Sequence, residues 1–159
     1  MRSILAAAVA GILLAGCASN PRIVHDRSGA TSSLEQLKGR VVVLTFWTDS
    51  CKPCLHQMPL VLESVASYGD HVLFLPVFAQ EKPGHKLDGW IEQQPQWFRD
   101  QICWANQDFL RKYDRGVMPR TYVYGRNGKL VEKFDGIIDA QRAPIFQASL
   151  LRALAAVRD

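Results

Sequence analysis

The stretch TDSCKPCLHQMP, residues 48 to 59, decides the fold that this sequence predicts, because it sets two cysteines between a predicted strand and a predicted helix. The segment before it, VVVLTFW at 41–47, is a continuous apolar run typical of a strand buried on both faces. After it, apolar residues recur at helical spacing to about residue 68. Cys51 and Cys54 therefore lie where a strand ends and a helix begins.

The rest of the chain predicts a single α/β domain, which its 159 residues can supply with a real core. The apolar run 71–79 predicts a second strand, parallel to the first, so that the two strands and the helix between them form a right-handed βαβ unit. Pro59 is expected to kink that helix. The further expected elements are a short helix broken near Pro95, a strand at 102–104, a helix at 108–113, strands at 120–124 and 129–134 around an Asn-Gly turn, and a helix from about Gln141.

The segment 20–38 is polar and rich in turn residues, and it predicts a tether that runs into an edge strand near residues 23–25. Before it, Arg2, an apolar run at 4–15 and small residues ahead of Cys17 form the pattern of a bacterial export signal. The apolar run is shorter than the roughly 20 residues that a membrane-spanning helix needs.

Leu14-Ala15-Gly16-Cys17 resembles a lipobox, the recognition sequence of bacterial lipoproteins. This resemblance implies a signal peptide at 1–16, lipidation of Cys17, a tether at 17–22 and a domain at 23–159. The protein would then be anchored in the cell envelope and face the periplasm, with Ala18 in place of Asp favouring the outer membrane. A plain signal peptide cut nearby and a buried N-terminal helix are the alternatives.

The distribution of charge and the number of cysteines argue against two classes of protein, nucleic-acid-binding proteins and disulfide scaffolds. The formal net charge is +4, but the basic residues are scattered, so the sequence shows no nucleic-acid-binding footprint. Of four cysteines, Cys17 is assigned to a lipid and Cys51 and Cys54 form one close pair, which is too few for a disulfide scaffold. Cys103, beside Ile102 and Trp104, is expected to be a buried core thiol, with a third redox thiol as the alternative.

The predicted position of the pair favours thiol chemistry. At a helix N-terminus, free backbone N–H groups and the helix dipole stabilise a thiolate at Cys51, and Lys52 adds a positive charge. Together they are expected to lower the pKa of Cys51 from about 8.5 into the range of about 3.5 to 7.5 known for such motifs. Cys51 is the candidate nucleophile, Cys54 one turn later is the candidate resolving thiol, and Pro53 keeps the turn rigid.

The runs VVVLTFWTDSCKPCLHQMPLV and GVMPRTYVYGRNGKLV, together with LKGR at 37–40, resemble the TlpA and ResA branch of the thioredoxin superfamily over roughly residues 23–157. The resemblance implies a thioredoxin-like fold with a central mixed β-sheet flanked by helices. It also implies an envelope thiol-disulfide oxidoreductase with no cofactor and no metal. Its partners would be exported proteins that carry thiols or disulfides, and a membrane protein would supply the electrons for their reduction.

The same resemblance implies that Pro119 is cis, and that Met118 and Pro119 form an edge on which a substrate strand docks. Two positions depart from the pattern: Thr45 stands where thioredoxins commonly have a buried acid, and Ser50 stands where a tryptophan is usual. Proton transfer then needs another group, and the candidates, each more typical of a solvated surface, are Asp49, His56, Glu81 and His85.

Three other interpretations of the pair stay open. Thr48-x-x-Cys51 fits the peroxidatic motif of peroxiredoxins, although Arg120 is one place from the arginine position and the expected proline is absent. A copper-binding or copper-delivery module could use both thiols with a histidine and the thioethers of Met58 and Met118, although no second CxxC is present. Two inert buried thiols are the structural alternative.

Overall fold

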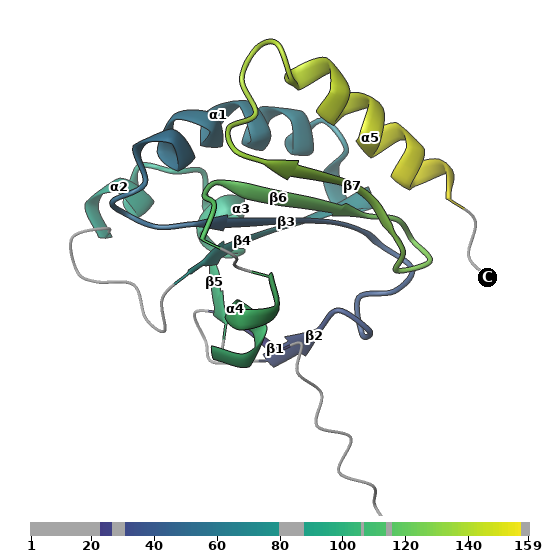
Figure 1. Ribbon diagram of the computed structural model, residues 1–159, viewed down its shortest axis with the longest axis horizontal. Coiled ribbons are helices and arrows are strands. Elements are labelled where there is room, and N and C mark those ends of the chain that lie inside the picture. The colour runs from purple at the N-terminus through teal and green to yellow at the C-terminus, as the bar shows by residue number, and fades with distance from the viewer. Residues whose placement is uncertain (1–22, 27–30, 80–87, 106, 114–115, 157–159) are drawn as a thin grey trace, which may run out of the picture.

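A mixed seven-stranded sheet forms the centre of the computed structural model (Figure 1), which describes residues 23–26, 31–79, 88–105, 107–113 and 116–156. The strands lie in the order β2-β1-β5-β4-β3-β6-β7. They are β1 (Ile23–Asp26), β2 (Thr31–Ser33), β3 (Val41–Trp47), β4 (Val72–Phe78), β5 (Cys103–Ala105), β6 (Arg120–Tyr124) and β7 (Leu130–Asp135). Strands β3, β4 and β5 are parallel, and the outer strands are antiparallel to their neighbours.

Helices cover both faces of this sheet. They are α1 (Lys52–Ala66), α2 (Asp88–Glu92), α3 (Gln96–Arg99), α4 (Gln107–Tyr113) and α5 (Ala143–Ala155), with a 3₁₀ turn η1 at Gly69–His71. Figure 1 shows α1 and α5 on one side of the sheet and α4 on the other. The core divides in the same way, because one cluster of buried side chains includes residues of α1 and α5 and a second includes residues of α4.

Strand β3 separates the two clusters, and all seven of its residues are buried. Successive side chains of a strand point to opposite faces, so Val43 and Trp47 pack on the side of α1 while Leu44 and Phe46 pack on the side of α4. The continuous apolar run therefore has the buried, central position that the sequence predicts. Helix α1 follows β3 directly and continues through Pro59 to Ala66.

Most of the predicted elements are confirmed, with ends that agree or differ by one or two residues. The parallel pairing of β3 and β4 confirms the βαβ unit, and the positive φ of 75° at Gly128 fits the predicted Asn-Gly turn before β7. The N-terminal segment needs a correction. Strand β1 is not at an edge, because it pairs with both β5 and β2, and β2 at Thr31–Ser33 falls inside the segment that was expected to be a tether.

Several sequence predictions lie outside the described residues. They are the signal peptide at 1–16, the lipidated Cys17, the tether at 17–22, and the proton-transfer candidates Glu81 and His85. Within the described ranges, no helix combines the length and the apolar character needed to span a bilayer.

Candidate active site

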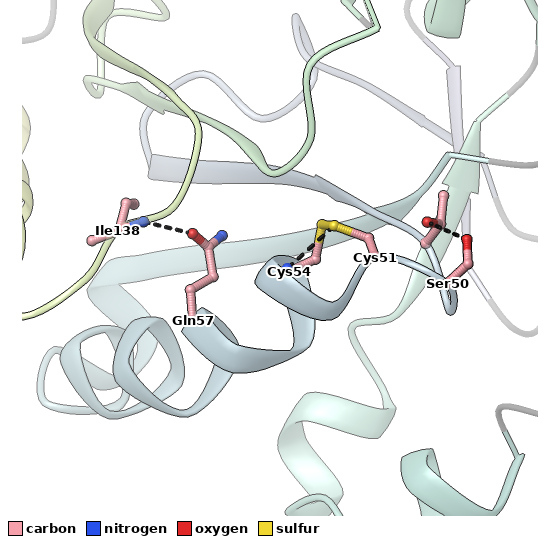
Figure 2. Close-up of a disulfide and its surroundings, with 6 residues drawn as sticks. Ser50, Cys51, Cys54, Gln57 and Ile138 are labelled. Atoms are coloured by element: carbon pink, nitrogen blue, oxygen red, sulfur yellow. Dashed lines mark hydrogen bonds between the residues drawn. A yellow bond between two sulfur atoms is a disulfide. The ribbon is translucent and has the colours of Figure 1, made fainter.

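The cysteine pair closes a disulfide at the start of α1, directly after β3 (Figure 2). The Cα atoms of Cys51 and Cys54 lie 5.2 Å apart, within the usual range for a disulfide. Cys51 is half-buried, whereas the side chain of Cys54 is fully buried in the cluster that packs under α1. One cysteine of the pair is thus partly exposed to solvent and the other is not.

Cys51 is the N-cap residue of α1, as the sequence predicts. Its sulfur accepts a hydrogen bond from the backbone N–H of Cys54 at 3.2 Å, a donor that would otherwise be unpaired at the helix start. The first turn of α1 contains no acidic residue, so no carboxylate in that turn opposes the positive end of the helix dipole. Lys52 and Pro53 occupy this turn, and both are exposed. The surroundings of the Cys51 sulfur therefore favour a negative charge.

Thr45 forms a neutral hydrogen-bonded pair inside the sheet, at the position where the family pattern commonly has an acid. Its hydroxyl lies 3.0 Å from the hydroxyl of Thr121 on β6, and both side chains are fully buried. Thr45 and Thr121 are direct partners in the β3–β6 register. By strand alternation Thr45 shares the face of Val43 and Trp47, which is the α1 side. On the face of the sheet that α1 covers, this position thus offers two hydroxyl groups and no charge.

Gln57 is a buried polar residue of the site that the sequence analysis missed. Its side chain is 1% exposed, and its Oε1 accepts the backbone N–H of Ile138 at 2.8 Å, which ties α1 to the loop before α5 (Figure 2). The amide nitrogen Nε2 is buried and has no hydrogen-bond partner among the described residues. Its place one helical turn after Cys54 was the available signal, because residues three apart share a helix face.

The peptide bond between Met118 and Pro119 is cis, as the family resemblance implies. Met118 is half-buried and packs against the same core cluster that contains Cys54, and Val117 before it is 44% exposed. The carbonyl oxygen of Pro119 accepts the N–H of Gly136, which joins the start of β6 to the end of β7. An exposed apolar side chain therefore lies next to the cis peptide bond.

Arg120 follows the cis peptide bond and is engaged away from the disulfide. Its Nε donates to Asp135 Oδ1 at 2.6 Å and its Nη1 donates to the carbonyl oxygen of Tyr113 at 3.1 Å. Burial lowers the pKa of Arg120, but the hydrogen bond to Asp135 and the charges of Tyr122 and Asp135 outweigh it, so the net pKa is raised. The guanidinium that a peroxidatic thiolate would need is thus bound to other groups.

The remaining candidate residues differ in their burial. Asp49 is half-buried, and His56 is exposed. Cys103 is buried and lies outside the disulfide, with its sulfur 3.7 Å from the carbonyl oxygen of Pro76, which confirms the expected core position. Met58 is fully buried. In the described parts of the chain, no three side chains of histidine, cysteine, aspartate or glutamate come together as a metal site.

Comparison with known proteins points to one family. The model of the AhpC/TSA family matches residues 19–133. The thiol-disulfide oxidoreductase ResA of Bacillus thuringiensis (strain Al Hakam) is 27% identical over 114 residues, which cover 72% of this chain and 65% of ResA. The chain thus spans slightly less than two thirds of that relative's length. The likeness supports the resemblance to the ResA branch.

Solved structures establish the fold. A crystal structure of a Chlorobium tepidum protein assigned as the thiol:disulfide interchange protein DsbE matches with a TM-score of 0.70 and 23% identity, over 83% of this chain and 92% of that one. The pneumococcal exposed lipoprotein thioredoxin Etrx1 from Streptococcus pneumoniae strain TIGR4 matches with a TM-score of 0.62 and 21% identity, over 85% and 98%. These likenesses confirm a single α/β domain with a thioredoxin-like fold, a central mixed sheet and flanking helices.

Proposed function

We propose that this chain, which belongs to the AhpC/TSA family, is a thiol-disulfide oxidoreductase that exchanges a dithiol and a disulfide with exported proteins through Cys51 and Cys54. One observation carries the proposal: the two cysteines close a disulfide at a helix N-terminus, and Cys51 is half-buried whereas Cys54 is fully buried. This asymmetry supports a division of labour between an attacking and a resolving thiol. The name of the relative ResA agrees with this chemistry.

The reaction is proposed to run as a reduction of the client. In the reduced protein, the Cys51 thiolate attacks a client disulfide, so that a mixed disulfide forms and one client sulfur leaves as a thiolate. Cys54 then loses its proton to solvent and attacks the Cys51 sulfur. The second client sulfur leaves, and the Cys51–Cys54 disulfide forms. Two electrons have passed to the client, and a membrane protein with a dithiol would have to return them.

Four further residues support this exchange. Lys52 and Pro53 stand in the first turn of α1, where a positive charge and a fixed backbone favour a preorganised Cys51 thiolate. Met118 and Pro119 are proposed to form the docking edge for a client strand, because the exposed Val117 adjoins them and Met118 packs on the cluster of the site. The client's backbone would pair beside Met118.

The protein is proposed to act in the bacterial envelope, held by a lipid on Cys17 and facing the periplasm, with a lean toward the outer membrane. The export pattern at 1–16 and the lipobox-like residues before Cys17 support this location. The relative Etrx1 is an exposed lipoprotein by its name, which agrees with such an anchor. An envelope location would also give the disulfide an oxidising compartment in which to work.

A turnover assay with single-cysteine variants tests the function. The full chain in detergent is mixed with a disulfide-bonded model protein and a small dithiol as reductant, and the release of client thiols is followed. Cys51→Ser is expected to fall to the rate of the reductant alone. Cys54→Ser is expected to accumulate a mixed disulfide at Cys51, because the resolving thiol is missing.

Cys103→Ala is the matched control, because it removes a buried cysteine that lies outside the pair. It should retain turnover close to that of the unmodified chain. Full exchange activity in Cys51→Ser would refute the assignment. Loss of activity in Cys103→Ala with a normal fold would instead give the third thiol a redox role.

A further inference from the structure

The side-chain amide of Gln57, one helical turn after the buried Cys54, has a hydrogen-bond partner for its oxygen but none for its nitrogen within the described residues. Its Oε1 is occupied by the backbone N–H of Ile138, so the orientation of the amide group is fixed and its Nε2 points away from that contact. In Figure 2 the nitrogen lies on the side of the amide that faces the disulfide. The nitrogen is buried, and no described residue accepts its hydrogen bond. A buried donor without a partner costs free energy, which is a reason to look for an acceptor in another redox state.

Cys54 supplies such an acceptor when the disulfide opens. In the disulfide its sulfur carries no charge, but in both directions of exchange it must exist briefly as a thiolate, as leaving group or as attacking group. Cys54 is fully buried, so water does not stabilise that charge. Gln57 stands three residues later on α1, where side chains share one helix face. The backbone N–H of Cys54 already donates a hydrogen bond to the sulfur of Cys51.

We infer that Gln57 is a positioning residue for the exchange reaction, whose Nε2–H donates to the Cys54 sulfur when the disulfide opens and stabilises its thiolate. The inference rests on the proposed function. When a client thiolate attacks the Cys51 sulfur, the S–S bond breaks and its electron pair goes to the Cys54 sulfur. The Gln57 amide then donates a hydrogen bond to the thiolate that forms there. In the reverse direction Cys54 gives its proton to solvent, and the same hydrogen bond favours the thiolate that attacks Cys51.

Trp47 is the rival donor. Its Nε1 is also buried without a hydrogen-bond partner in the described part of the chain, and it belongs to the same core cluster as Cys54. Trp47 lies on β3, however, and its ring packs against Phe78 and Trp90, with centroids 5.2 and 5.6 Å away. Gln57 is favoured because it shares a helix face with Cys54 and its nitrogen faces the disulfide.

The charged groups around this point are exposed, half-buried or hydrogen-bonded to other groups. Lys52 on α1 is exposed, and Asp49 before α1 is half-buried. On the loop that faces Gln57, Asp139 accepts the backbone N–H of Arg142, and Arg142 donates to the carbonyl oxygen of Ile137. Among these groups, Gln57 is the buried neutral donor, one helical turn after Cys54 on the same helix.

A titration of Cys54 tests the inference without turnover. The full chain with Cys51→Ser and Cys103→Ala serves as parent, and the thiolate absorbance in the ultraviolet is followed with pH. Subtraction of the same chain with Cys54→Ala isolates Cys54 from every other chromophore. Gln57→Leu is expected to raise the pH of half-ionisation by roughly one unit, a tenfold loss of thiolate at a given pH, since a hydrogen bond to a charged group is lost.

Gln57→Glu distinguishes loss of the amide N–H from loss of the contact with the loop. A carboxylate still accepts the Ile138 N–H, but it has no amide proton to donate. It is expected to raise the midpoint at least as far as Gln57→Leu. A shift in Gln57→Leu alone would assign the effect to the loop contact, and a shift in Gln57→Glu alone would assign it to charge repulsion. Either result overturns the inference.

Trp47→Phe removes the rival N–H and should leave the midpoint unchanged. A shift in Trp47→Phe with none in the Gln57 variants would transfer the role to the indole and refute the inference. If Gln57→Leu does not fold, as judged by circular dichroism, Gln57→Met replaces it. A chain that shows the Gln57 effect but no client turnover would disprove the proposed function, and with it the role of Gln57 in exchange, and would leave only the hydrogen bond from Gln57 to the Cys54 thiolate.

Discussion

At the scale of single residues, Cys51 and Cys54 differ mainly in their surroundings. Cys51 lies at the N-terminus of α1, is half-buried and accepts a backbone hydrogen bond, while Cys54 is enclosed by the core. The helix dipole and the free N–H groups act on the first sulfur most strongly, because their effect falls off within the first turn. Two residues of the same type therefore acquire different reactivities from their positions alone.

Lys52 is expected to set part of the reduction potential. Its charge stabilises the Cys51 thiolate and hence the reduced protein, so Lys52→Gln should make the protein more reducing. Because Lys52 is exposed and screened by water, the expected shift is small, about 10 to 20 mV toward negative values. Equilibration with glutathione buffers measures it.

Lys112→Gln on α4 is the matched control, since it removes an equal charge from an exposed position on the other side of the sheet. It should leave the potential unchanged. The shift in Lys52→Gln should also shrink at high salt. A potential that rises in Lys52→Gln would contradict this account of the thiolate.

At the scale of elements, the hydroxyl pair of Thr45 and Thr121 joins β3 to β6. Thr45→Val leaves the buried Thr121 hydroxyl without its partner, so the free energy of unfolding should fall by about 1 to 3 kcal/mol. The double variant with Val at both positions should recover much of that loss, because no hydroxyl is then left unpaired. Urea unfolding of the oxidised chain measures Thr45→Val, Thr121→Val and the double variant. Additive losses in the double variant would show that the two hydroxyls do not interact.

Arg120 and Asp135 form the corresponding link between β6 and β7. The side chain of Arg120 is 6% exposed and that of Asp135 is 42% exposed, so the carboxylate is partly screened while the guanidinium is buried. The hydrogen bond from Lys133, followed by that from Arg120, holds the pKa of Asp135 below its ordinary value. This pair anchors the strand that follows the cis peptide bond at Met118–Pro119.

Asp135→Asn is expected to destabilise the chain at neutral pH by about 1 to 3 kcal/mol, because the buried Arg120 loses its ionic partner. A carboxyl with a lowered pKa contributes its stability above its unfolded pKa of about 3.9, and loses it as pH falls through the folded pKa. The difference between the two chains should therefore shrink in acid. Chemical unfolding at pH 7 and near pH 3 measures both values.

Glu132→Gln is a suitable comparison, since Glu132 pairs with Arg152 at 3.0 Å on the surface and should contribute little. If the cost of Asp135→Asn stayed the same at both pH values, its origin would lie in packing or polarity and not in the ionised pair.

At the scale of the whole molecule, the sequence predicts the parts that bury continuous apolar surface. Strand β3 has the bounds 41–47 that its apolar run predicts, and α1 begins at the cysteine pair. Strand β2 was missed because Thr-Ser-Ser has the polar composition of a turn, and only its pairing with β1 makes it a strand. That pairing depends on the sheet as a whole, which local composition does not encode.

The candidate active site also has features that the sequence predicts and features that it does not. The cysteine pair, its place at a helix start and the cis Met118–Pro119 bond could be anticipated from motifs or from the family resemblance. The spacing of Gln57 from Cys54 indicates a shared helix face, but its contact with Ile138 could not be anticipated, because Ile138 is 81 residues away and glutamine is usually exposed. Arg120 lies one place from the position of a peroxidatic arginine in the sequence, and the β6–β7 register pairs it with Asp135.

The location of the protein gives a further prediction at this scale. If Cys17 carries the lipid, Cys17→Ser should abolish incorporation of a labelled fatty acid and move the protein out of the membrane fraction of the expressing cells. Cys103→Ser is the control, and it should keep both label and membrane association. Unchanged labelling in Cys17→Ser would contradict the lipoprotein assignment and favour a plain signal peptide.

The reduction potential of the Cys51–Cys54 pair tests the central claim most directly. The full chain is equilibrated in detergent with graded glutathione buffers without metal ions, and the fraction of the intramolecular disulfide is measured on the peptide that contains both residues. The account predicts one two-electron transition between about −270 and −120 mV, the range of exchange-active pairs. A potential below about −300 mV, typical of structural disulfides, or failure to form the disulfide at all would contradict the account.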